Sequence, residues 1–201
     1  MSLAIIIITV LVSITAFNNH DTFNNLKFNA WLIKEKNQTW RFFSYALVHA
    51  GWMHLLINMF VLWSFGGLVE EGFFIYFGSP KNMLYFGLLY VGGIIFSTLF
   101  DFGKQKNNPY YDAVGASGAV SAVVFASILF APDNTLLIFP IPFPVPAYVF
   151  GILYLVYSAY MSKQGKDNIG HNAHFYGALF GFIFPIALKP ALFQHFLNQI
   201  F

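Results

Sequence analysis

The sequence AVGASGAVSAVVFASILFA, residues 113–131, carries no charged side chain. It is long enough to cross a membrane, since a transmembrane helix needs about 20 predominantly apolar residues. Ser117 lies near its start, between Gly115 and Gly118. This placement has a structural interpretation, because small residues let membrane helices pack closely. It also has a chemical one, because small neighbours leave a hydroxyl accessible as a nucleophile.

Composition places the whole chain among integral membrane proteins. Of its 201 residues, 58% are hydrophobic and 20% aromatic, and only 9% are charged, whereas soluble domains have about 25% charged residues. The size favours a single domain over residues 1–201. A net charge of +2 argues against nucleic acid as a partner. The absence of cysteine excludes disulfides and thiolate chemistry.

Charge-free runs predict six membrane spans. They cover about residues 3–17, 53–69, 83–100, 113–131, 145–162 and 168–188. The first run is short enough for a signal peptide, but no Lys or Arg precedes it, so we interpret it as a span. Pro recurs at every second position from Pro140 to Pro146. Because Pro is excluded from helix interiors, we expect a loop before the fifth span.

The segment between the first two spans, residues 18–52, has a different character. It mixes charged residues with Trp31, Trp40 and Trp52. Trp is enriched at the membrane–water interface. We therefore expect a structured loop that lies partly in the interface, rather than an ordinary solvated connector.

Six spans would place several polar residues toward one side of the membrane. His54 and Asn58 lie near the start of the second span, and Ser117 lies near the start of the fourth. His174 lies near the start of the sixth. Each of these spans begins from an odd-numbered loop, and all odd-numbered loops lie on the same side. The four residues therefore share one face of the protein.

Small residues recur at helical spacing in the fourth and sixth spans. They are Gly115, Gly118, Ala119, Ala122 and Ala126 in the fourth, and Ala173, Gly177 and Gly181 in the sixth. This pattern is typical of helices that pack closely in a membrane. Such packing would bring Ser117 and His174 together.

These residue types suit nucleophilic attack on an amide. A serine hydroxyl needs an adjacent base, and His174 can act as one near neutral pH. His54 and Asn58 are spaced i, i+4 and share a helix face. With the Ser117 backbone amide, they could donate hydrogen bonds to the oxyanion that forms on the carbonyl. The sixth span holds no acid beside His174, and we interpret Asp167 as a loop charge, so a Ser–His dyad is expected.

Four motifs resemble those of the rhomboid intramembrane serine proteases. They are WRFF at 40–43, HLLIN at 54–58, GASG at 115–118 and AHFYGALFG at 173–181. The resemblance covers nearly the whole chain and implies an all-α membrane protein. The implied fold is a six-transmembrane-helix rhomboid-like bundle with an interfacial first loop.

The resemblance also implies a role for each site residue. Ser117 would be the nucleophile and His174 the base, with no cofactor and no metal. The oxyanion hole would consist of His54, Asn58 and the Ser117 backbone amide. Residues of structural motifs would be Arg41, Glu70, Gly115, Gly118, Gly177 and Gly181. The implied partners are the lipid bilayer and transmembrane proteins cut within or next to their membrane helix.

One position departs from the family pattern. Many members carry an aromatic residue one turn after the nucleophile, and it packs on the catalytic histidine. Here that position is Ser121, and a hydroxyl cannot stack on an imidazole. The departure leaves open how His174 is held.

Two indications of orientation conflict. Eight of the ten Lys and Arg residues fall in the first, third and fifth loops, and these residues usually accumulate on the cytoplasmic side. The resemblance implies the opposite, an active site that opens outward from a bacterial inner membrane. We follow the resemblance, because it rests on four motifs in register.

Three alternative functions compete with this interpretation. An inactive rhomboid-like protein would bind membrane proteins without cutting them, but such relatives usually lack the serine or the histidine. A zinc site could gather His49, His54, His171 and His174, yet the HExxH signature is absent. A transporter or channel would spread its polar residues across the membrane, and here they gather on one side.

Overall fold

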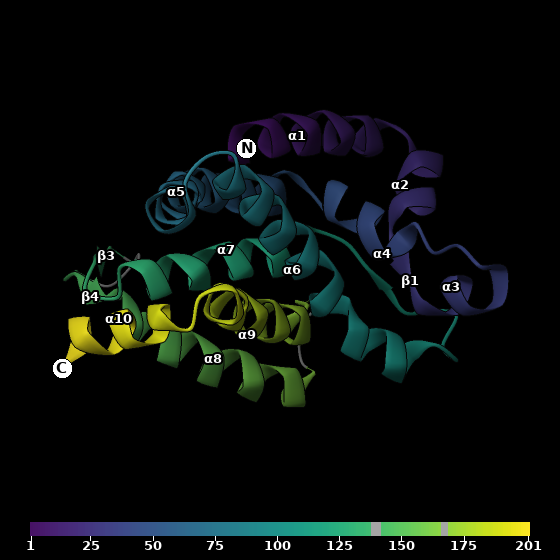
Figure 1. The fold of residues 1–201 in the computed structure, drawn as a ribbon. Helices are drawn as coiled ribbons and strands as arrows, with labels where there is room; N and C mark the ends of the chain where they lie inside the picture. Colours follow the sequence, from purple (N-terminus) through teal and green to yellow (C-terminus); the bar gives the residue numbers. More distant parts are fainter. Residues whose placement is uncertain (138–141, 166–168) are drawn as a thin grey trace.

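The computed structural model describes residues 1–137, 142–165 and 169–201. Within them the chain is built almost entirely from helices (Figure 1). Three residues named above, Pro140, Asp167 and the sixth span's first residue, Asn168, lie outside the described part. 

Each predicted span corresponds to a helix. In chain order, the helices of the described residues are α1 (Ser2–Asn18), α2 (His20–Leu26), α3 (Ala30–Lys36), α4 (Arg41–Ser44), the 3-10 helix η1 (Tyr45–Leu47), α5 (Trp52–Phe77), α6 (Lys81–Gln105), α7 (Ser117–Phe130), α8 (Ala147–Gln164), α9 (His171–Leu188) and α10 (Ala191–Ile200). Those that correspond to the six predicted spans are α1, α5, α6, α7, α8 and α9. Two short antiparallel pairs join β1 (Phe28–Asn29) to β2 (Asp112–Ala113) and β3 (Thr135–Leu136) to β4 (Val145–Pro146). The expected all-α architecture is confirmed apart from these pairs.

The number of membrane spans stays a prediction. By length and composition, α5 and α6 can each cross a membrane. A third crossing results if α9 and α10, which are bent by 117° at their junction, count as one span. Helices α1 and α7 are apolar but shorter. The 14 residues of α7 extend about 21 Å, less than the roughly 30 Å of a hydrocarbon core.

The fourth predicted span begins four residues too early. Helix α7 starts at Ser117, not at Ala113. Ala113 instead pairs with Phe28 in the β1–β2 ladder. Gly115 then adopts a positive φ of 109°, a conformation that interrupts any helix and that favours glycine. Ser117 is therefore the first residue of its helix.

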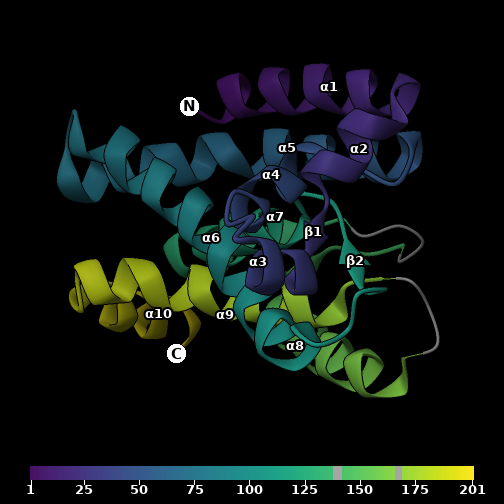
Figure 2. The ribbon, with the colours of Figure 1, turned by 90° about the vertical axis from the view of Figure 1, so that its right-hand side faces the viewer.

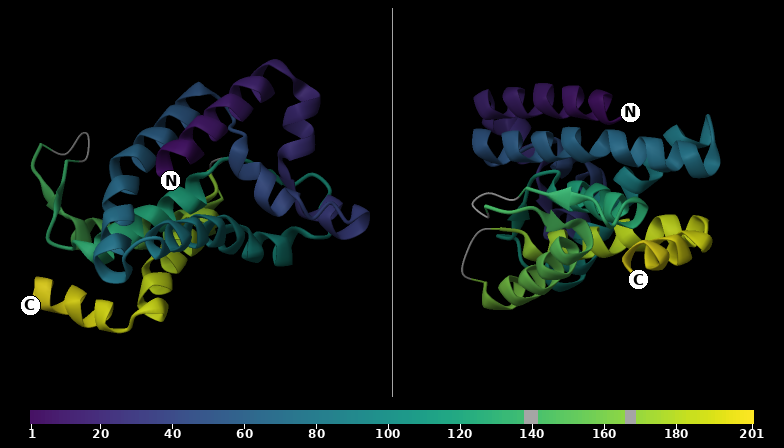
Figure 3. Two further views of the ribbon diagram at one scale, coloured as in Figure 1. Left: turned by 45° about the horizontal axis from the view of Figure 1, so that its top comes forward. Right: turned by 90° about the vertical axis from the view of Figure 1, so that its left-hand side faces the viewer.

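Helix α7 is the centre of the fold. Every residue from Gly118 to Phe130 is buried, and α7 contacts α5, α6, α8, α9 and α10 (Figures 1 and 2). Helix α1 lies along α5 on the outside of the bundle (Figure 2). Helix α10 turns away from the end of α9 (Figure 3). A helix enclosed on all sides leaves only its ends accessible, and Ser117 lies at one end.

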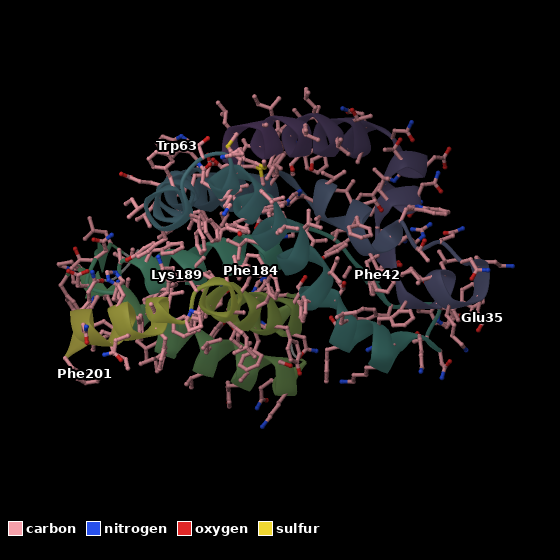
Figure 4. All side chains as sticks on the ribbon, viewed as in Figure 1. Glu35, Phe42, Trp63, Phe184, Lys189 and Phe201 are labelled. Carbon is pink, nitrogen blue, oxygen red and sulfur yellow. The ribbon has the colours of Figure 1, made fainter. Side chains whose placement is uncertain are left out.

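The outer surface of the bundle is apolar. Trp63 projects outward from α5 (Figure 4) with 67% of its surface exposed. Other large apolar side chains exposed on α5 and α8 are Leu56, Ile57, Phe60, Ile75, Ile152, Leu153 and Val156. Exposed apolar surfaces of this extent mark contact with another apolar phase. Together with the composition, they indicate an integral membrane protein.

The first loop is structured, which confirms that part of the prediction, and its position at the membrane interface stays a prediction. It contains α2, β1, α3, α4 and η1. Arg41 is 3% exposed and connects separate parts of the loop. Its Nη1 donates to the carbonyl oxygens of Asn24 (2.9 Å) and Lys27 (2.6 Å), and its Nε donates to Gln38 Oε1 (2.6 Å).

Candidate active site

Two backbone N–H groups of the segment before Ser117 donate hydrogen bonds to the first loop, one to a carbonyl oxygen and one to a histidine ring. The Gly115 N–H donates to Tyr45 O (3.0 Å), and the Ala116 N–H donates to His49 Nε2 (3.3 Å). Because the first N–H groups of a helix have no intrahelical acceptor, the Ser117 amide is available at the end of α7. The positive end of the helix dipole favours negative charge at the same point.

His49 holds this segment as a neutral imidazole of defined tautomer. Its Nε2 accepts from Ala116, so its proton lies on Nδ1, which is 3.0 Å from Ser13 Oγ. The Ser13 hydroxyl in turn donates to Leu47 O (2.8 Å). His49 is fully buried, and this burial, with a smaller effect of His54, lowers the pKa of His49 to about 3. The sequence singled out His49 only as a possible metal ligand, and the structure gives it this positioning contact.

The two predicted side-chain donors lie on α5 beside the same segment. The His54 ring packs directly on Gly115, where a Cβ would overlap the imidazole. Asn58, one turn later, is 5% exposed, and its Nδ2 donates to His54 O (2.9 Å). An amide nitrogen carries two hydrogens, so Asn58 keeps a second one for another acceptor.

Backbone contact between α7 and α9 places the segment that carries Ser117 beside the segment that carries His174. A Cβ on Gly118 would lie 3.2 Å from Ala173 O, and one on Gly177 would overlap Gly118 O. One turn further, a Cβ on Gly181 would overlap Ala122 O. Ser117 precedes Gly118, and His174 follows Ala173. The close helix packing predicted from the small residues is therefore present, at the level of the candidate nucleophile and base.

An aromatic neighbour of His174 comes from α8, a helix that the sequence predicted as a span but did not connect with the site. The Tyr154 ring on α8 lies nearly parallel to the His174 ring, with centroids 6.3 Å apart and an interplanar angle of 26°. The Tyr154 hydroxyl is 2.7 Å from Ser121 Oγ. The His171 ring meets the His174 ring edge-on, with centroids 6.0 Å apart. Tyr154 is one of several aromatic residues on α8, and no sequence pattern distinguishes it.

A buried carboxylate on α6, also missed in the sequence, contacts the start of α9. Asp101, at 4% exposure, accepts from the Tyr111 hydroxyl (2.8 Å) and from Asn172 Nδ2 (3.0 Å). These residues line a cavity of about 200 Å³ that His171 also borders. Asn172 lies two residues before His174, so Asp101 anchors the first turn of the helix that carries the candidate base.

Glu70 makes its contacts far from this site. Its Oε1 accepts from the Ser2 N–H (2.6 Å), at the first turn of α1. The contact fixes the start of α1 against α5.

The described residues hold no group of three or more His, Asp or Glu side chains arranged for a metal ion. The four histidines considered above form two ring pairs instead. One joins His49 and His54, with centroids 5.0 Å apart, and the other joins His171 and His174.

A family model of the Rhomboid domain matches residues 36–191, which is well over half of the chain. The chain therefore belongs to the rhomboid family. It is 31% identical over 95 residues to Rhomboid-related protein 2 of Mus musculus, covering 45% of this chain and 26% of the mouse protein. It is 25% identical over 174 residues to Rhomboid-related protein 1 of Caenorhabditis elegans, covering 83% of this chain and 45% of the nematode protein. The chain thus matches less than half the length of either relative.

Proposed function

We propose that this protein is an intramembrane serine endopeptidase that cuts transmembrane proteins within or next to their membrane helix. The observation that carries the proposal is that α5 and α9 both contact α7 or the segment just before it, at the end of α7 where Ser117 lies. Ser117 begins α7, the His54 ring packs on Gly115 just before it, and α9 brings Ala173 against Gly118 beside it. Nucleophile, oxyanion donors and base would thus come from three separate elements.

In the proposed reaction, Ser117 Oγ attacks the carbonyl carbon of the scissile peptide, and His174 takes the hydroxyl proton. The oxyanion accepts hydrogen bonds from the Ser117 amide, His54 and Asn58, of which each donor is worth about 10²–10³ in rate. Collapse of the intermediate breaks the C–N bond, and the protonated His174 gives its proton to the leaving amine. Water then hydrolyses the acyl-enzyme by the same steps.

The setting of the enzyme is part of the proposal. A single domain over residues 1–201 would cross the bacterial inner membrane six times, with the active site opening to the extracytoplasmic side. Substrates would be membrane helices with residues that unwind readily near the cleaved bond, since regular helix shields its carbonyls. Gly, Pro and small polar residues disfavour helix and would assist cleavage.

Labelling with a serine-directed fluorophosphonate in detergent tests the proposal. The wild type should be labelled at Ser117 and should cut a model transmembrane substrate. Ser117→Ala should abolish both, and His174→Ala should be inactive because the serine has no base. Cleavage should persist in EDTA. Cleavage by Ser117→Ala, or loss in EDTA with recovery on adding zinc, would contradict the assignment.

A wild type that binds transmembrane segments but is neither labelled nor active would identify an inactive rhomboid-like binding protein instead.

A further inference from the structure

We infer that Tyr154 of α8 is a positioning residue for His174, and that Ser121 of α7 fixes it in that role. The inference rests on the proposed function, because it concerns how the base of that reaction is oriented. It adds α8 to the helices on which the site depends.

The geometry carries the inference in two contacts. The Tyr154 and His174 rings lie 6.3 Å apart and nearly parallel, within the 4.5–7 Å range of offset aromatic pairs. The Tyr154 hydroxyl lies 2.7 Å from Ser121 Oγ. Ser121 is 6% exposed and lies one turn after Ser117 on the same helix. A direct chain of contacts thus leads from the nucleophile's helix, through Ser121 and Tyr154, to the face of the base.

The surroundings of Tyr154 leave its ring little freedom. The Phe125 and Phe150 rings each lie with centroids 5.7 Å from the Tyr154 ring. The Tyr154 side chain is partly buried among these apolar rings, so its hydroxyl needs a polar partner, and Ser121 supplies it. The serine therefore has a specific task at this position: it satisfies the hydroxyl and fixes where the ring lies.

The contact matters for His174 because its ring torsion is intrinsically soft. The χ2 torsion of histidine is broad and has no sharp staggered minima. A flat ring held against the imidazole excludes orientations that would turn its nitrogen away from Ser117. Misplacing a reacting group by about 1 Å can cost about 10²-fold in rate, so a ring that restricts the base should affect kcat.

The experiment compares four variants with the wild type: Tyr154→Leu, Tyr154→Phe, Ser121→Ala and the double variant Ser121→Ala/Tyr154→Phe. Tyr160→Leu is the matched control, since Tyr160 lies on the same helix with 60% of its surface exposed. For each protein, the measurements are kcat and KM on a transmembrane substrate, the rate of fluorophosphonate labelling and the thermal unfolding midpoint in detergent.

Tyr154→Leu should lower kcat and the labelling rate together by about 10- to 100-fold, with KM within about twofold. Tyr154→Phe keeps the ring and should recover most of this loss, leaving a deficit of about two- to tenfold from the missing hydrogen bond. Ser121→Ala should show the same deficit. The double variant should be no worse than either single change, because all three remove one interaction. Tyr160→Leu should match the wild type.

The outcomes distinguish a failure of the proposed function from a failure of the proposed role of Tyr154. A wild type that neither labels nor cleaves overturns the proposed function and the role of Tyr154 with it. An active wild type with Tyr154→Leu within twofold in kcat overturns only the role of Tyr154. If Tyr154→Leu unfolds, Tyr154→Phe and Ser121→Ala decide. Multiplicative losses in their double variant, or no loss in either, refute the inference.

Discussion

Replacing Gly177 with alanine would insert a methyl group into the contact between α7 and α9. A Cβ at this position would overlap Gly118 O and would lie 3.0 Å from Gly118 Cα. The obstacle is backbone, so no side-chain rotation can relieve it. Relief requires that the two helices move apart.

The size of that movement follows from ordinary contact distances. Carbon atoms pack at about 3.5–4.0 Å, so restoring a normal distance to Gly118 Cα displaces α9 by roughly 1 Å. Overpacking of this kind costs about 1–3 kcal/mol, against a gain of about 1 kcal/mol from the higher helix propensity of alanine. Because Gly118 adjoins Ser117, the same displacement should lower kcat by about 10²-fold.

Steady-state cleavage and denaturant unfolding in detergent measure the two effects. The matched control is Gly67→Ala in α5, where a Cβ meets nothing within 4 Å. That control should be neutral or stabilising by up to about 1 kcal/mol, with unchanged kinetics. A Gly177→Ala protein with the stability and kcat of Gly67→Ala would refute the close contact of α7 and α9, and with it the account of how the site is assembled.

Three further predictions concern the oxyanion hole, pH and orientation. Asn58→Ala should slow cleavage by about 10²–10³-fold, and an unchanged rate would remove Asn58 from the oxyanion hole. Burial lowers the pKa of His49 from 6.5 in the unfolded chain to about 3, so the stability that its neutral form contributes is present above about pH 6.5 and is lost as the pH falls toward 3. Denaturant unfolding should therefore show that the free energy of unfolding falls by up to about 2 kcal/mol between pH 7 and pH 5, and by less in His49→Asn. Equal losses in both proteins would contradict the assignment of His49 as a buried, neutral imidazole. In intact cells, a membrane-impermeant maleimide should label Lys104→Cys and should reach Lys81→Cys only after the cells are opened; the reverse pattern would mean that the Lys and Arg distribution indicates the true orientation.

The membrane class and the helical architecture could be predicted from the sequence, because each depends on local properties. The roles of the candidate site residues stay a prediction. Hydropathy and the spacing of charges located six of the helices, α1 and α5 to α9, but not α10 or the short helices of the first loop. The four-residue spacing of Ala173, Gly177 and Gly181 predicted a close helix contact, since a small residue permits close approach whatever its partner. The proposed pairing of Ser117 with His174 follows if two such faces meet, and the contact between Gly118 and Gly177 is consistent with it.

The start of α7 could not be predicted in this way. The residues from Ala113 to Ala116 are as small and apolar as those of the helix that follows, so hydropathy assigns them to the same span. Two features prevent the helix from starting before Ser117, namely the pairing of Ala113 with Phe28 and the positive φ of Gly115. The pairing partner lies 85 positions earlier in the sequence, and a contact over such a separation has no local signature.

The neighbours that hold the two histidines were likewise decided by tertiary structure alone. Hydropathy measures the tendency to leave water, and it is the same for a ring that faces lipid and for one that faces a histidine. Hydropathy therefore does not distinguish Tyr154 from Tyr160. The docking of α8 turns one ring toward His174 and Ser121 and leaves the other 60% exposed. His49 acquired its role for the same reason, because its partners Ser13 and Ala116 come from α1 and from the segment before α7, and only the packed fold places them on opposite nitrogens of one ring.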